Sequence, residues 1–186
     1  MSQISVVMGS KSDWPTVKEA CQILDQFGVD YNKNVISAHR MPDEMFAFAK
    51  GAVANGTKVI IACAGGAAHL PGMIAANTPL PVIGIPGQTR ALGGMDSLLS
   101  IVQMPAGIPV ATTAIGVAGA KNAALLALQI LGITDQQIQD QIVAYRKQMH
   151  DQAAESGAHL DYDDSTGPND WHYRRWPARP DDGPRC

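Results

Sequence analysis

Cysteine is scarce in this sequence. Only Cys21, Cys63 and Cys186 occur in 186 residues, and no two of them form the Cys-x-x-Cys pair that is typical of zinc and redox sites. This scarcity excludes a disulfide framework and favours a reducing compartment. Cys63 has no basic neighbour in the sequence that would lower the pKa of its thiol, so we expect a small buried residue and not a nucleophile.

Charge of either sign is also scarce. Charged residues make up 17% of the chain, and 14 Lys and Arg against 17 Asp and Glu give a formal net charge of -3. A chain without excess positive charge has no field that would attract a polyanion, which argues against nucleic-acid binding. Gly, Pro and His interrupt the apolar runs and no segment resembles a signal peptide, so we expect a cytoplasmic protein that does not enter a membrane.

What the sequence does contain is a series of short apolar runs, each bounded by Gly, Pro or Ser. Continuous runs of this length are typical of parallel strands that are covered on both faces. Stretches with apolar residues at the helical period lie between and after them. The predicted strands are 4–8, 35–36, 59–61, 82–85 and 109–112. The predicted helical stripes are Val17, Ala20, Cys21, Leu24 and Phe27, and Ile138, Ile142, Tyr145 and Met149.

Strand and helix alternate five times, which predicts an α/β fold, a three-layer doubly wound parallel sheet of the flavodoxin-like or Rossmann-like type. The length fits one catalytic domain over residues 1–154, with a C-terminal helix, and the composition changes near its end. Residues 155–186 form the predicted tail, which is irregular and either disordered or docked on a neighbouring subunit through Trp171, Tyr173 and Trp176.

Three helix starts can be predicted from side-chain chemistry. Ser12 is expected to cap the first helix, and Pro42 suits the first turn of the second. Thr134 with Gln137 has the spacing of a capping box.

The loop after the first strand contains Ser10, Ser12 and Asp13 at the start of a helix. Backbone N–H groups and serine hydroxyls at such a place form an anion site, and a carboxylate can accept from ribose hydroxyls. The same residues also fit a capped helix without a ligand. The loop lacks the Walker lysine and the three-glycine dinucleotide fingerprint.

The loop after the second strand reads Ser37-Ala38-His39-Arg40. Ligands of a doubly wound sheet bind at this end of the strands, where an imidazole can carry a proton and an arginine can hold a phosphate or carboxylate. A surface arginine beside a histidine that caps a carbonyl is the alternative for this pair alone.

The third strand leads into residues 62–73, where Gly and Ala dominate up to His69. Small residues let a ligand approach the backbone, whose N–H groups can hold an anion. His69 is either a second acid–base group or a residue that fixes the loop. We expect no metal site, because His39 and His69 lack carboxylate or thiol companions at ligand spacing. The glycines of residues 86–94 suit a mobile lid or a subunit contact.

Three of these segments together closely resemble the 5-(carboxyamino)imidazole ribonucleotide mutase family: Gly-Ser-Lys-Ser-Asp-Trp at 9–14, Ser-Ala-His-Arg at 37–40 and Ala-Gly-Gly-Ala-Ala-His-Leu-Pro-Gly-Met at 64–73. The stretches 96–105 and 114–124 are similar to it as well, and the resemblance covers about residues 3 to 150. It implies transfer of a carboxylate from the exocyclic nitrogen to carbon 4 of aminoimidazole ribonucleotide, in purine biosynthesis and without a cofactor.

The resemblance also implies roles for individual residues. His39 matches the catalytic histidine of the family, and the other matching positions would contact the ribonucleotide or the transferred carboxyl group. Those substrate-binding positions are Ser10, Ser12, Asp13, Ser37, Arg40, Ala64, Gly65, Gly66, His69 and Leu70. The family forms octamers, and the nearly uncharged segment 107–131 agrees with a homo-oligomer whose sites neighbouring chains complete.

Two other functions remain open at this point. A related carboxylase uses free carbon dioxide, but it typically has Lys after the histidine, where this chain has Arg40, and lacks the His-Leu-Pro-Gly loop present here at 69–72. A non-catalytic flavin or nucleotide module on the same fold is the other alternative, although a passive phosphate site has no use for His39. The chain departs from the family pattern at Met41, Cys63 and Gly87, which affects the expected lid more than the chemistry.

Overall fold

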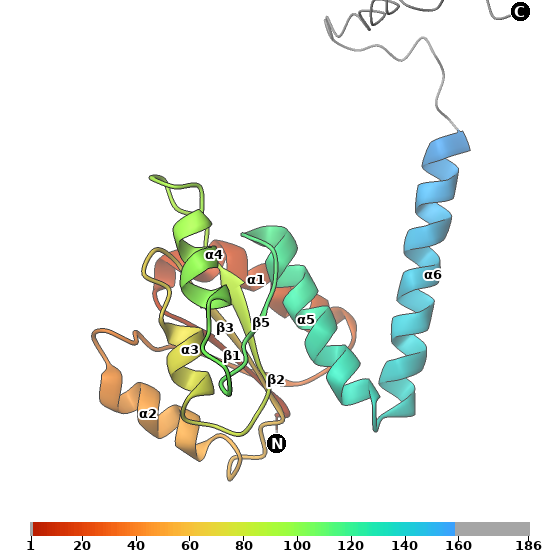
Figure 1. Ribbon diagram of the computed structural model, residues 1–186. Helices are drawn as coiled ribbons and strands as arrows, with labels where there is room; N and C mark the ends of the chain where they lie inside the picture. Colours follow the sequence, from red (N-terminus) through yellow and green to blue (C-terminus); the bar gives the residue numbers. More distant parts are fainter. Residues whose placement is uncertain (1, 159–186) are drawn as a thin grey trace, which may run out of the picture. The chain divides into compact units, whose positions relative to one another are not determined.

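A computed structural model of the chain describes residues 2–158 and has a five-stranded sheet at its centre (Figure 1). The strands lie in the order β2-β1-β3-β4-β5, and every neighbouring pair is parallel. Their bounds are β1 Ile4–Met8, β2 Tyr31–Val35, β3 Val59–Ala64, β4 Val82–Pro86 and β5 Ala111–Thr112. This is the order of the flavodoxin-like doubly wound sheet, so the predicted fold class is confirmed.

Helices cover both faces of the sheet and complete the three layers (Figure 1). One face packs on α1 (Trp14–Gln26), which follows the short 3-10 helix η1 (Lys11–Asp13), and on α5 (Val117–Gly132). The other face packs on α2 (Pro42–Gly51), α3 (Leu70–Ala75) and α4 (Met95–Val102). Each face of the sheet has its own hydrophobic core. Alternate residues of each inner strand pack into one core and then the other, because successive side chains point to opposite faces.

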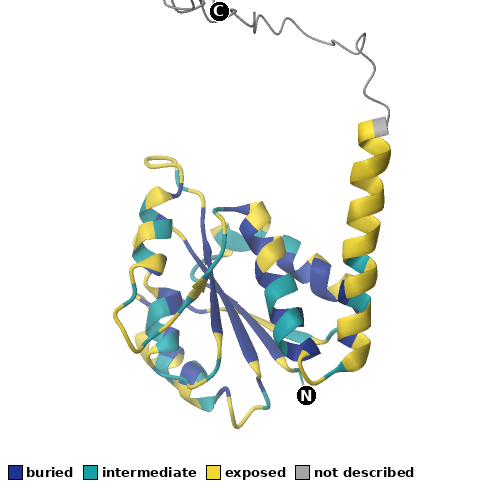
Figure 2. Cartoon of the chain, turned by 45° about the vertical axis from the view of Figure 1, so that its right-hand side comes forward, coloured by how far each residue is buried: buried dark blue, intermediate teal, exposed yellow. Residues whose placement is uncertain are grey.

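Strands β1, β3 and β4 are buried along their whole length, as the continuous apolar runs predict (Figure 2). The edge strand β2 is different: its sequence is Tyr-Asn-Lys-Asn-Val and its residues are exposed or half-buried. The second strand predicted at 35–36 overlaps β2 only at Val35, so its bounds and its expected burial on both faces were wrong. A polar edge strand owes its conformation to pairing with β1, and that pairing leaves no apolar pattern in the sequence.

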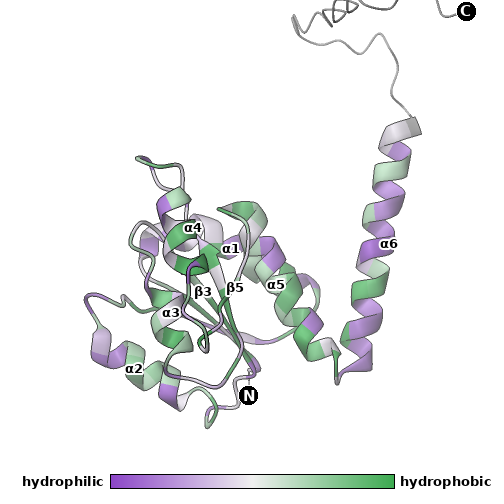
Figure 3. Ribbon diagram, in the orientation of Figure 1, coloured by the Kyte–Doolittle hydropathy of each residue, from purple (hydrophilic) through white to green (hydrophobic). Residues whose placement is uncertain are grey.

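The predicted apolar stripe of α1 is confirmed, since all five of its residues are buried in one core cluster. The same cluster contains one face of α5, the mainly hydrophobic helix in Figure 3. The nearly uncharged segment 107–131 thus covers much of its apolar surface inside the chain. In α6 (Gln136–Ala158), Ile138 and Ile142 are buried and the Tyr145 ring lies 5.6 Å from that of Phe27, whereas Met149 is exposed.

Both predicted helix caps were wrong, and a residue one or two positions away forms the cap instead. Ser10, and not Ser12, is the N-cap of η1 and forms a capping box with Asp13. Asp135, and not Thr134, caps α6, because its carboxylate accepts from the N–H groups of Gln137 and Ile138 at 3.0 and 3.2 Å. Ser, Thr, Asp and Asn cap almost equally well, so the sequence alone could not choose between adjacent candidates. Pro42 begins α2, as predicted.

The chain divides into two units, Met1–Arg146 and Lys147–Cys186. The first contains the sheet and the five helices that cover it. The predicted tail aromatics Trp171, Tyr173 and Trp176 lie outside the described residues. No helix among residues 2–158 is long and apolar enough to cross a membrane.

Candidate active site

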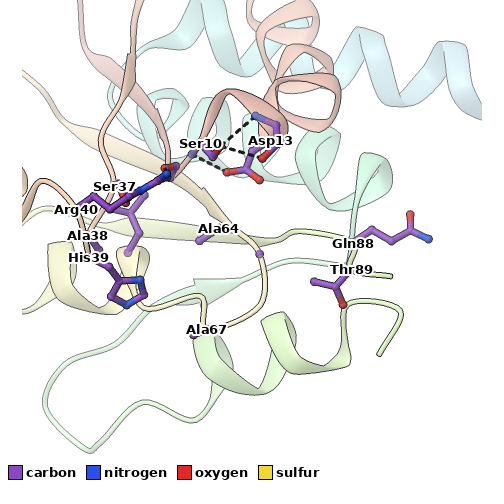
Figure 4. Close-up of a pocket in the computed structure, with 14 residues that line it drawn as sticks. Ser10, Asp13, Ser37, Ala38, His39, Arg40, Ala64, Ala67, Gln88 and Thr89 are labelled. Carbon is purple, nitrogen blue, oxygen red and sulfur yellow. Dashed lines mark hydrogen bonds between the residues drawn. The ribbon is translucent and has the colours of Figure 1, made fainter. Parts of the chain in front are cut away.

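A cavity of about 500 Å³ lies beyond the carboxyl ends of β1, β2, β3 and β4. In the order β2-β1-β3-β4-β5, the strand that follows β1 in the sequence lies on one side of it, and the strand that follows β3 lies on the other side. The strand order therefore reverses between β1 and β3, and ligands of doubly wound sheets bind at such a switch point. The cavity brings together loops that are far apart in the sequence (Figure 4). Its lining residues are Gly9, Ser10, Ser12, Asp13, Ser37, Ala38, His39, Arg40, Ala64, Gly65, Ala67, Leu70, Gln88 and Thr89.

Several hydrogen bonds lie within the first loop. Oδ2 of Asp13 accepts from the Ser10 N–H at 3.0 Å, and Oγ of Ser10 accepts from the Ser12 hydroxyl at 2.9 Å and from the Ser12 N–H at 3.3 Å. Burial raises the pKa of Asp13, while hydrogen bonds from the backbone of Ser10 and Gly9 oppose the shift. The loop forms a helix cap and is also part of the cavity wall, so its role as a cap does not prevent it from contacting a ligand.

The second loop is tied to the first through Arg40. Its Nε donates to Oγ of Ser37 at 3.1 Å, and its Nη2 donates to the carbonyl of Gly9 at 3.4 Å. Ser37 is buried while His39 and Arg40 are exposed at the cavity. The guanidinium therefore stands beside the Ser10 and Asp13 loop with N–H groups left for an anion.

His39 and His69 are hydrogen-bonded to each other, with Nε2 of His39 2.8 Å from Nδ1 of His69. Their rings meet edge to face, at an interplanar angle of 88° and a centroid distance of 5.0 Å. His39 lines the cavity, whereas His69 is exposed and is not one of the lining residues. His69 therefore contacts the imidazole that lines the cavity.

The third loop presents backbone to the cavity. Ala64, Gly65, Ala67 and Leu70 line it, and among the described residues the N–H groups of Gly65 and Ala67 have no hydrogen-bond acceptor in the protein. Gly66 is not a lining residue: its φ of 72° turns the chain, and its N–H donates to Oγ of Ser97 at 2.9 Å. Two donors at a small apolar wall suit a carboxylate.

Gln88 and Thr89 are lining residues that the sequence prediction assigned only to a possible lid. They lie across the cavity from His39 and Arg40 (Figure 4). Thr89 is held in place, because its hydroxyl donates to Oδ1 of Asp96 at 2.7 Å and accepts from the Gly94 N–H at 3.1 Å. Their position directly after β4 was the available signal, since every parallel strand ends at the same edge.

All predicted site residues except Gly66 and His69 line the one cavity. Cys63 is buried and its burial raises the pKa of the thiol, in agreement with the expected structural role. Residues 2–158 contain no group of three or more His, Cys, Asp or Glu side chains that could hold a metal ion.

Comparison with known proteins identifies close relatives. The family described as AIR carboxylase matches residues 3–152. A Bacillus subtilis protein named N5-carboxyaminoimidazole ribonucleotide mutase is 58% identical over 157 residues, 84% of this chain and 97% of that protein. One of the same name from Escherichia coli is 55% identical over 155 residues, 83% of this chain and 92% of that protein. The crystal structure of Treponema denticola PurE has a TM-score of 0.77 at 28% identity, covering 85% of this chain and 98% of that one. The family match includes every loop of the cavity.

Proposed function

The chain belongs to the AIR carboxylase family, and we propose that it is an N5-carboxyaminoimidazole ribonucleotide mutase of purine biosynthesis. Relatives that carry this name are 55% to 61% identical to it and include bacterial and archaeal proteins. The enzyme is an isomerase that moves a carboxylate from the exocyclic nitrogen to carbon 4 of aminoimidazole ribonucleotide.

The observation that supports this chemistry best is the position of His39 in one cavity with an anion-binding wall and a small apolar wall. Arg40 and Ser10 are proposed to bind the phosphate of the ribonucleotide, and Asp13 a ribose hydroxyl. The imidazole of the substrate then extends toward residues 64–70 at the end of β3, here called the glycine loop. His39 lies between these two ends of the ligand.

His39 is proposed to carry the proton in both halves of the reaction. It donates to the carbamate nitrogen, the nitrogen–carbon bond breaks, and carbon dioxide and aminoimidazole ribonucleotide result. Carbon 4 of the electron-rich ring then attacks carbon dioxide, and His39 removes the proton from that carbon. The reaction is redox-neutral and returns the histidine to its starting form, so no cofactor is needed. General acid–base catalysis of this kind contributes about 10² to 10⁴ in rate.

The glycine loop is proposed to retain the carbon dioxide. Ala64, Gly65 and Ala67 supply small apolar surface, and the free N–H groups of Gly65 and Ala67 supply donors for a carboxylate. A carbon dioxide molecule held against carbon 4 reacts at an effective concentration far above its concentration in solution. Leu70, the first residue of α3, closes the apolar side.

A product assay tests the proposed function against the carboxylase alternative. The purified protein is given the carbamate substrate in one reaction, and aminoimidazole ribonucleotide with bicarbonate in the other. A mutase forms the carbon-4 carboxylate directly from the carbamate and shows little dependence on added bicarbonate. Product formation that requires free carbon dioxide would identify a carboxylase, and a yellow purified protein would indicate a flavin module.

We further propose that the chain forms a homo-octamer in which neighbouring copies complete each cavity. Four large apolar side chains are exposed on and just before α4, a surface that a partner copy would cover. They are Leu92, Met95, Leu99 and Val102. Sedimentation at micromolar concentration tests this assembly, and a species of about 20 kDa would overturn it. Free and buried Cys21 and Cys63 agree with the cytoplasm as its compartment.

A further inference from the structure

Helix α4 has an unusual distribution of side chains for its place at the sheet. Met95, Leu99 and Val102 are about half exposed, while Ser97 is 0% exposed. Ser97 and Ser100 meet the loops that follow β3 and β4. The helix therefore uses its hydroxyl groups, and not only its apolar residues, to contact the cavity wall.

The hydroxyl of Ser97 joins two loops of the cavity. Its Oγ accepts from the Gly66 N–H at 2.9 Å and donates to the Gly87 carbonyl at 2.7 Å. A serine hydroxyl has one proton to donate, so the bond to Gly87 fixes its orientation and leaves a lone pair for Gly66. Ser97 is fully buried, so solvent water does not reach the Gly66 N–H or the Gly87 carbonyl to replace these hydrogen bonds if the hydroxyl is removed.

A second hydroxyl holds the other side of Gly66. The single proton of the Ser100 hydroxyl is shared between the Asp96 carbonyl, at 2.7 Å, and the Gly66 carbonyl, at 3.2 Å. The N–H and the carbonyl of Gly66 are thus both hydrogen-bonded to side chains of α4. Gly66 has a positive φ, in the left-handed region. The neighbours of Gly66 in the sequence, Gly65 and Ala67, are lining residues whose N–H groups have no acceptor among the described residues.

The two joined loops lie close together at Gly87. A Cβ atom placed there would be 3.1 Å from Cα of Gly65 and 3.2 Å from the carbonyl oxygen of Ala64. The wall between the loop after β3 and the loop after β4 is therefore closed by backbone contact. The Gly87 N–H also donates to the Ala64 carbonyl at 2.8 Å, and the Ser97 hydroxyl extends this junction to Gly66, where no backbone bond within residues 2–158 joins the two loops.

We propose that Ser97 is a positioning residue, which holds the glycine loop against the β4 loop and thereby keeps carbon dioxide in the cavity between its release from the carbamate and its capture by carbon 4. This role rests on the mutase function proposed above. Ser97 touches neither substrate nor the reacting atoms. It acts through the backbone of Gly66 and Gly87.

The test measures how the carbamate substrate is partitioned. Each productive turnover gives the carbon-4 carboxylate, and each loss gives aminoimidazole ribonucleotide and free carbon dioxide, after subtraction of the spontaneous loss without enzyme. In Ser97→Ala we expect the share of lost turnovers to rise about tenfold and kcat for product to fall about ten- to a hundredfold, with KM changed by less than about twofold. Ser100→Ala should give a smaller change in the same direction, because its bond to Gly66 is longer.

Ser5→Ala is the matched control. Ser5 is also buried and its hydroxyl is bonded to that of Thr57 at 3.0 Å, but it lies toward the amino end of β1 and does not line the cavity. It should lower the melting temperature without altering the partition. If Ser97→Ala partitions the substrate as wild type does, or only as Ser5→Ala does, the positioning role is overturned. If wild-type protein itself forms no product from the carbamate, the proposed function fails instead.

Discussion

Nε2 of His39 and Nδ1 of His69 share a hydrogen bond of 2.8 Å, so the proton on one imidazole determines the tautomer of the other. When His39 donates in this bond, its Nδ1 is left with a lone pair, and when it accepts, its Nδ1 carries the proton. The first form can accept the proton from carbon 4 at Nδ1, and the imidazolium that results donates from Nδ1 to the carbamate while its Nε2–H still donates to Nδ1 of His69. A single contact therefore supports both proton roles of His39 in the proposed mechanism.

His39→Asn should reduce interconversion of substrate and product by about 10² to 10⁴ while the protein still folds, assembles and binds product. Asparagine is similar in size and forms hydrogen bonds but carries no proton near neutral pH. Initial rates in both directions and a binding titration with product provide the measurement. Near-normal turnover in this variant would remove His39 from the mechanism.

His69→Asn should be milder, with a loss in kcat of about tenfold and an altered pH dependence of kcat, because His69 fixes the tautomer of His39 without lining the cavity. The pH–rate profiles of the wild type and the variant are compared over the same range. If this variant lost all activity while His39→Asn kept it, the proton carrier would be His69 and the assignment would be reversed.

Arg40→Ala should weaken nucleotide binding by about 1.5 to 3 kcal/mol, since an anionic ligand loses a charge-assisted contact. Calorimetric titration with product at two salt concentrations measures the effect, which should shrink as salt rises. Lys58→Ala provides the control, because this exposed cation lies just before β3 at the opposite end of the strands. An equal loss in both variants would mean that only net charge matters.

Asp13→Asn should increase the melting temperature relative to wild type more at about pH 7 than at about pH 3.5. The pKa of Asp13 is raised above its ordinary value of 3.8 by burial, so the folded state binds this proton more tightly than the unfolded state. The stability that this group contributes is present below 3.8 and is lost as pH rises through the folded-state pKa. Asparagine avoids that loss and can still accept from the Ser10 N–H. A benefit confined to acid pH would contradict the argument.

Removal of residues 158–186 should leave kcat and KM unchanged, because every lining residue of the cavity precedes residue 90 and the family match ends at residue 152. Steady-state assays of the shortened and full-length proteins make the comparison, with sedimentation to follow assembly. Lost activity in a shortened protein that keeps its oligomeric state would make the tail part of the active site.

The buried strands and most of the cavity were predictable because they depend on local pattern. Continuous apolar runs predict β1, β3 and β4, and the carboxyl ends of parallel strands locate Ser10, His39 and Gly65. The role of Gly66 was not predictable. Glycine composition indicates a loop that a ligand approaches, but its N–H turns toward Ser97, a residue 31 positions away in the sequence. Tertiary contacts of this kind leave no periodic signal.

The hydrogen bond between His39 and His69 was equally beyond the sequence. The two histidines are 30 residues apart, and both alternatives for His69, acid–base group or loop fixture, fitted the motif. Only the parallel pairing of β1 with both β2 and β3 brings the two following loops together. Motifs identified the residues, whereas strand order determined which of them touch.

The two edges of the sheet bear on how copies of this chain can associate. Edge strand β2 has Lys33 at its centre with asparagine on each side, and the opposite edge strand β5 is only two residues long. A charged edge and a very short edge are both poor templates for the addition of a strand from another chain. Continuous intermolecular sheets, and the aggregation that follows from them, are thereby disfavoured, and self-association is directed to helix surfaces.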